Sequence, residues 1–159
     1  MEENTIQKKE VKTGLNGWLA LLGVGLILQP FNLISKIIHY IPLLNQNYVV
    51  PGLFTIITFE FIIYVIWLIA DLYILYLYFK KNKKFPLYFT IYWIVIVIYS
   101  FIDPMITSFL DFSVIGKQNS LNSAISDGWG VFWYNLIISI IWVWYIRVSA
   151  KVKATFINN

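Results

Sequence analysis

Four long apolar runs constrain the fold more than any other feature of the sequence. They cover about residues 15–40, 53–79, 85–110 and 129–148. Each run exceeds the roughly 20 residues that an α-helix needs to cross the hydrocarbon core of a bilayer. In lipid, backbone amides must find partners within the protein, which leaves helices or closed barrels as spanning structures. Runs such as IYWIVIVIY do not alternate polar with apolar residues, as barrel strands do. The sequence therefore predicts an all-α polytopic membrane protein with four transmembrane helices in a small bundle.

The composition agrees with lipid as the solvent and excludes several kinds of chemistry. Charged residues make up 13% of the 159 residues, whereas a soluble domain carries roughly 25%. The absence of cysteine excludes disulfides, thiolate metal sites and cysteine nucleophiles. His39 is the one histidine, so two histidines of this chain cannot ligate a haem or a metal. We therefore expect no cofactor and no metal.

No catalytic signature is present in the sequence. It contains no P-loop, no G-x-S-x-G elbow, no H-E-x-x-H zinc motif and no glycine-rich dinucleotide fingerprint. The connections between the apolar runs are short and leave little room for a separate soluble site. We therefore expect that the protein is not an enzyme.

The positions of the basic residues predict the orientation. They gather in residues 1–13, in the KKNKK linker at 80–84 and near the C-terminus, while the other two connections hold only Lys117. Positive charge beside transmembrane helices stays on the cytoplasmic side. We predict a cytoplasmic N-terminal arm, a transmembrane domain over residues 14–149 and a cytoplasmic tail over residues 150–159. Because these charges flank the spans, they do not form a nucleic-acid surface, and we expect no nucleic-acid partner.

Three ionisable residues lie inside predicted spans, namely Lys36, Glu60 and Asp103. Burying each of them in hydrocarbon costs free energy unless it has a partner or a role. All three lie at a similar depth near the outer ends of their helices, and Asn135 lies at a similar depth in the fourth. One hypothesis is a buried cluster that binds a cation, a proton or a polar headgroup. The alternative is a structural salt bridge, or a lysine that extends outward to the interface.

Two further groups of residues each have two possible interpretations. Asp71 lies deeper in the second span, where it is either a proton relay or a hydrogen-bond partner of a Ser, Tyr or Trp on a neighbouring span. The basic linker either contacts anionic lipid headgroups or only sets the topology. Its lysines are Lys80, Lys81, Lys83 and Lys84.

Three stretches of the chain form a recognisable pattern. The first is GLNGWLALLGVGLILQP at 14–30, the second is Glu60 followed by FKKNKKFP at 79–86, and the third is the closing WVWYIRVSAKVKATF at 142–156. In these stretches the chain resembles the bacterial DUF2569 membrane proteins, and the first is similar to the family's opening. The third differs from the family pattern at Trp144, where proline is expected, and at Lys151, where arginine is usual. The resemblance implies a four-span protein of a bacterial cytoplasmic (inner) membrane, in a family of unknown function.

These features predict an integral membrane protein that acts as a non-enzymatic accessory or assembly component. Its expected partners are the lipid bilayer and another membrane protein or a second copy of the chain. The alternative is a small oligomeric transporter, or an ion- or proton-conducting protein that uses Lys36, Glu60 and Asp103. Because four spans rarely enclose a pathway alone, this alternative requires self-association.

The predicted orientation can be tested with reporter fusions. Fusions at Asn159 and within residues 80–84 are expected to report a cytosolic location, because both sites adjoin positively charged flanks. An insertion within residues 111–128 is the control and is expected on the opposite side. A cytosolic signal from that insertion, or an outside signal from either of the first two, would contradict the predicted topology.

Overall fold

The computed structural model describes residues 14–46, 52–109 and 118–156, and these residues form five α-helices. In order along the chain they are α1 (Trp18–Leu43), α2 (Leu53–Phe79), α3 (Phe85–Ser108), α4 (Gln118–Val148) and α5 (Ala150–Phe156). No strand occurs in the described part of the chain. The all-α fold class is therefore confirmed.

Four of the helices are long and apolar enough to cross a membrane. The spanning segments are Trp18–Leu43, Leu53–Phe79, Phe85–Ser108 and Ile125–Val148. The predicted polytopic membrane fold with four transmembrane helices is confirmed. α4 begins at Gln118, earlier than the predicted start at 129, because a helix propagates readily beyond the hydrocarbon once it is nucleated. It continues without a break through Trp144.

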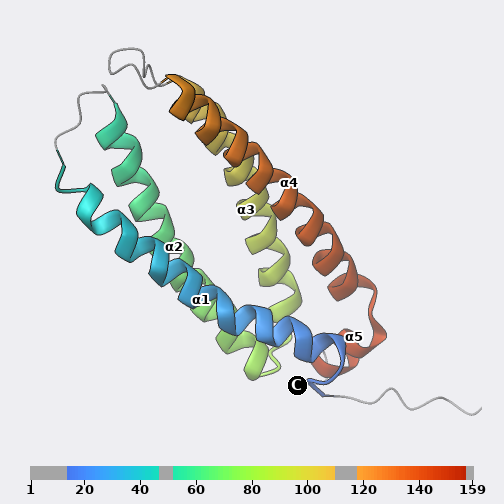
Figure 1. The fold of residues 1–159 in the computed structure, drawn as a ribbon. Coiled ribbons are helices and arrows are strands. Elements are labelled where there is room, and N and C mark those ends of the chain that lie inside the picture. The colour runs from blue at the N-terminus through green and yellow to red at the C-terminus, as the bar shows by residue number, and fades with distance from the viewer. Residues whose placement is uncertain (1–13, 47–51, 110–117, 157–159) are drawn as a thin grey trace, which may run out of the picture.

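Consecutive helices form two hairpins that diverge from a common end (Figure 1). α1 packs along α2, and α3 packs along α4, whereas the contact between α2 and α3 is much smaller. We name the end that carries residues 80–84 and α5 the base, and the opposite end the open end. α1 and α4 have no extended contact with each other, and the backbones of the two hairpins separate toward the open end (Figure 1).

Aromatic packing and a buried hydrogen bond hold the hairpins together at the base. The ring of Phe156 in α5 stacks on Phe85 of α3, with 4.6 Å between ring centroids, and lies 6.0 Å from the ring of Tyr78 in α2. The Tyr78 hydroxyl donates a 2.5 Å hydrogen bond to the backbone carbonyl of Leu19 in α1. All four side chains are almost completely buried. The base therefore joins α1, α2, α3 and α5 in one core.

The C-terminal helix α5 is part of this core, a role that the sequence interpretation of residues 150–159 as a tail did not include. Val152 and Phe156 are buried. Thr155 accepts a 3.2 Å hydrogen bond from the backbone N–H of Gly14, and the Lys151 ammonium donates a 2.8 Å hydrogen bond to the carbonyl of Asn16. α5 thereby connects the start of α1 to the end of α4.

Large apolar side chains cover the outside of the four long helices. Phe31, Ile69 and Trp144 are each 64–66% exposed. Such a surface would drive a water-soluble protein to aggregate, but in hydrocarbon it faces a solvent as apolar as itself. The surroundings of these helices are therefore a lipid bilayer.

Two glycines of α1 have different surroundings, because Gly23 is closely packed and Gly25 borders open space. A Cβ atom at Gly23 would lie 2.7 Å from the Tyr78 hydroxyl oxygen, which cannot move freely because it is buried and bonded to Leu19. A Cβ atom at Gly25 would meet no atom within 4 Å.

We expect Gly23→Ala to lower the unfolding free energy by about 1–3 kcal/mol, as overpacking does. Gly25→Ala is expected to leave it unchanged or raise it by up to about 1 kcal/mol through helix propensity. Thermal unfolding in mild detergent measures both, and equal effects would contradict the contact.

Candidate functional site

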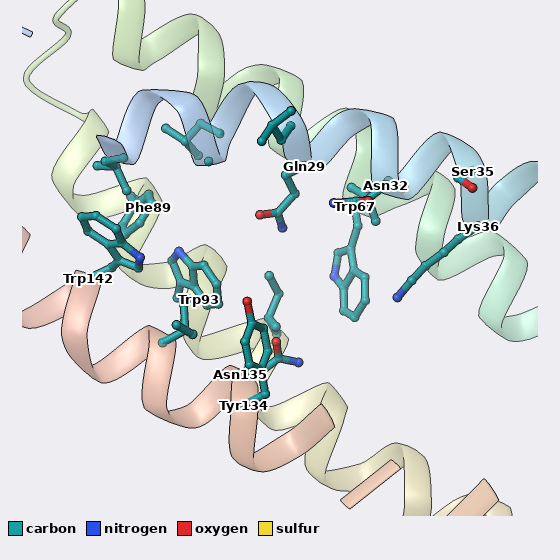
Figure 2. A pocket seen from close by; sticks show the side chains of 17 residues that line it. Gln29, Asn32, Ser35, Lys36, Trp67, Phe89, Trp93, Tyr134, Asn135 and Trp142 are labelled. Carbon is teal, nitrogen blue, oxygen red and sulfur yellow. The ribbon is translucent and has the colours of Figure 1, made fainter. Parts of the chain in front are cut away.

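A cleft of about 700 Å³ lies between the two hairpins, and we name it the interhairpin cleft. α1 and α4 form its two long walls, α3 supplies its floor, and α2 contributes Trp67 (Figure 2). Its volume falls in the range of about 300–1,000 Å³ that is typical of small-molecule sites. Its lining residues are Leu22, Gly25, Leu26, Leu28, Gln29, Asn32, Leu33, Ser35, Lys36, Trp67, Phe89, Trp93, Ile96, Tyr134, Asn135, Ile138 and Trp142.

The lining changes from apolar to polar along the cleft. Toward the base it consists of Leu22, Phe89 and Trp142, whereas Lys36 lies at the other end (Figure 2). The helical repeat brings the polar residues of α1 to this one wall, because Gly25, Gln29, Asn32 and Lys36 recur at intervals of three and four. Asn135 faces them from α4. The cleft therefore has a hydrophobic end and a cationic end.

Lys36, Glu60 and Asp103, which we name the charged layer, come from α1, α2 and α3 and interact electrostatically with one another. The hydroxyl of Tyr40 donates a hydrogen bond to the carboxylate of Glu60. The hydroxyl of Tyr99 donates a 3.3 Å hydrogen bond to Asp103. The structure thus brings together three of the four residues that the sequence places in one cluster. The fourth, Asn135, lines the interhairpin cleft together with Lys36.

Each charged residue of this layer has a tyrosine one helical turn away on its own helix. The pairs are Lys36 with Tyr40, Glu60 with Tyr64, and Asp103 with Tyr99. Residues four apart lie on one face of a helix, so the charges and the tyrosine rings share one layer.

The rings around the charged layer form a continuous aromatic chain. The centroid of Tyr64 lies 5.3 Å from Tyr40 and 5.9 Å from Trp67, and Trp67 lies 4.6 Å from Tyr99. The Lys36 ammonium lies 5.0 Å from the centroid of the Tyr64 ring. Within the described residues, this lysine contacts an aromatic face and forms no direct ion pair with a carboxylate.

Asp71 is a separate buried carboxylate. Its side chain is fully buried, and neither of its oxygens has a hydrogen-bond partner among the described residues. Tyr92 of α3 interacts with it electrostatically, and both interpretations of Asp71, proton relay and hydrogen-bond partner, stay predictions. The Tyr92 hydroxyl in turn accepts a 2.9 Å hydrogen bond from the side-chain amide of Gln29 on the cleft wall. Polar groups therefore connect Asp71 to the interhairpin cleft.

The lysines of the α2–α3 linker lie at the base and do not belong to the cleft. Lys80, Lys83 and Lys84 are exposed and Lys81 is half-buried. Lys81 adopts a left-handed backbone conformation with φ of 51°, which helps the chain to reverse between the two helices. Contact with anionic headgroups stays a prediction for these residues.

The helices, the apolar exterior and the interhairpin cleft define a multi-pass membrane protein with a cleft between its spanning helices. Comparison with known protein families shows which family the chain is related to. A family model described as "Protein of unknown function (DUF2569)" matches residues 12–157, nearly the whole chain. The chain therefore belongs to the DUF2569 family. No curated protein and no solved structure matches it.

The burial of Asp71 can be tested by an isosteric neutral substitution. We expect Asp71→Asn to raise the unfolding free energy by about 1–3 kcal/mol, because an amide costs less than an ionisable carboxyl group to bury without a partner. Thermal unfolding in mild detergent measures the change. Asp127→Asn is the control, because Asp127 is exposed on α4, and we expect no shift from it. Destabilisation by Asp71→Asn would indicate that the carboxylate has a partner essential to the fold.

Proposed function

We propose that this protein is a non-enzymatic membrane component that holds a guest molecule from the bilayer in its interhairpin cleft. One observation carries the proposal: α1 and α4 flank a polar and aromatic cleft instead of packing on each other. Polar side chains at membrane depth need partners, and the cleft exposes several of them between its walls. An accessory protein that acts through another molecule of the membrane requires such an open, lined space.

The lining supports binding rather than catalysis. Its hydroxyls belong to Ser35 and Tyr134, and Lys36 is its one ionisable base. Ser35 and Lys36 are adjacent on α1, and adjacent helical residues do not face each other. In the described residues no three metal-ligating side chains gather at one place. The lining thus offers no paired nucleophile and base.

The location that we propose is a bacterial cytoplasmic membrane, with the base facing the cytoplasm. The basic linker 80–84, together with Lys151 and Lys153 of α5, gives this end of the molecule a concentration of positive charge. Positive charge beside transmembrane helices is retained in the cytoplasm. The family membership is compatible with this location.

A second candidate function is conduction of an ion or proton by an assembly of several copies. It is favoured by the charged layer, in which two carboxylates and one ammonium from three helices interact. It differs from the first proposal in requiring a homo-oligomer, because the charges of one copy do not line an enclosed pathway.

The guest proposal can be tested by filling the cleft. Gly25 lines the cleft, Gly130 lies on the exposed surface of α4, and a Cβ atom at either would meet nothing within 4 Å. We expect Gly25→Phe to displace the guest, because its ring occupies the cleft. Gly130→Phe is the matched control, because it gains a similar helix propensity without entering the cleft. Native mass spectrometry of protein extracted in mild detergent measures the mass of the bound guest.

The expected result is a guest of defined mass on the wild-type protein and on the Gly130→Phe variant, and its loss from the Gly25→Phe variant. Retention of the guest by the Gly25→Phe variant would contradict binding in the cleft. A homo-oligomer without any guest would contradict the proposal and favour conduction.

A further inference from the structure

We infer that the guest is a phospholipid whose headgroup carries an amine, with the phosphate held at Lys36 and the amine directed to Glu60 and Asp103. This inference rests on the proposed function and names the chemistry of the guest. It commits to one class of lipid because the cleft has a hydrophobic end, a single cation on its wall and two carboxylates beside that cation.

The length and polarity of the cleft fit an acyl chain with a polar head. Along α1 the lining extends from Leu22 to Lys36, which is about 21 Å at the helical rise of 1.5 Å per residue. The apolar end is closed by Phe89 and Trp142, whereas Asn32 and Lys36 lie at the polar end (Figure 2). A small polar solute would leave the hydrophobic end empty, and a plain hydrocarbon would leave the polar end unpaired.

The depth of Lys36 places the polar end near the headgroup level. α1 has 26 residues, so it is about 39 Å long and exceeds a hydrocarbon core of about 30 Å. Lys36 lies seven residues before Leu43, the end of α1, which is about 10 Å along the axis. A helix centred in the bilayer therefore carries Lys36 close to the edge of the hydrocarbon. A phospholipid entering sideways between α1 and α4 reaches this level with its phosphate.

The donors at the polar end suit phosphate oxygens. Lys36 supplies an ammonium, and Asn32 and Asn135 supply side-chain amides from opposite walls of the cleft. Hydrogen bonds from a charged donor to phosphate are stronger than neutral ones. No carboxylate lines the cleft in the described part of the chain, so the wall itself does not repel the phosphate.

The charged layer distinguishes between headgroups. Glu60 and Asp103 act electrostatically on Lys36 from the neighbouring helices. Two carboxylates beside one ammonium repel a headgroup that is purely anionic, and they attract an amine bonded close to the phosphate. The rings of Tyr64 and Tyr99 also favour a cation, and the Lys36 ammonium already lies over the Tyr64 ring.

The preference can be measured on purified protein from which endogenous lipid has been removed. Phosphatidylethanolamine and phosphatidylglycerol with identical acyl chains are added separately, and binding is measured by native mass spectrometry. We expect phosphatidylethanolamine to bind the wild-type protein about tenfold more tightly, a ratio that corresponds to one charge-assisted contact. The Gly25→Phe variant is expected to bind neither lipid.

Variants of the charged layer test the two halves of the headgroup separately. Neutralising both carboxylates, with Glu60→Gln and Asp103→Asn together, is expected to remove the preference for the amine-bearing lipid. Lys36→Gln is expected to weaken binding of both lipids about tenfold, because each carries a phosphate. Asp127→Asn is the control for charge, and it is expected to leave the ratio unchanged.

The outcomes separate this inference from the proposed function. If both lipids bind equally, or if phosphatidylglycerol binds better, and Gly25→Phe abolishes the binding, the cleft holds a guest but the headgroup assignment is wrong. If Gly25→Phe leaves lipid binding intact, the proposed cleft function is wrong as well. Because the ratio for the wild-type protein decides the headgroup assignment alone, the test does not depend on whether the doubly neutralised variant folds.

Discussion

The packing at the base is the interaction on which the rest of the structure depends. Lipid tails are as apolar as the helix surfaces, so hydrophobic burial does not drive transmembrane helices together, and specific packing and hydrogen bonds must do so. Here these contacts concentrate where Tyr78 bonds to the carbonyl of Leu19 and where Phe85 stacks on Phe156. Because α5 joins the same core, the start of α1 and the end of α4 are fixed at one place. Away from the base, the described residues of α1 and α4 form no comparable contact with each other.

The interhairpin cleft follows from this uneven distribution of contacts. Two hairpins joined firmly at one end separate toward the other (Figure 1). The polar stripe of α1, with Gln29 and Lys36, then faces the space between the walls and does not pack against another helix. A closed bundle of the same length would bury these groups against one another. The open arrangement leaves the ammonium of Lys36 and the amides of Asn32 and Asn135 at the edge of the cleft for the guest that we propose.

The sequence predicted the four spans and the residues of the charged layer, because both depend on short-range rules. Runs of about 20 apolar residues require helices in lipid, and a helix fixes which residues share a face. The sequence did not predict that α5 belongs to the core or that Tyr40 bonds to Glu60. The contacts of α5 join segments far apart in the sequence, and the Tyr40–Glu60 bond depends on how α1 and α2 are aligned along each other. The gap between α1 and α4, with Trp93 at its floor, depends on how the two hairpins cross.

The two ends of the molecule are packed differently: the two hairpins are in close contact at the base and separate toward the charged layer (Figure 1). At the base, Gly23 permits contact so close that a single added carbon would collide with Tyr78. At the other end, Lys36 lies over the Tyr64 ring while Glu60 and Asp103 hold bonds from tyrosines, so the charges are partnered without closing the space between the hairpins. A molecule that binds only the folded state adds its binding free energy to stability. The guest that we propose would therefore supply, between α1 and α4, the contacts that the helices do not make with each other.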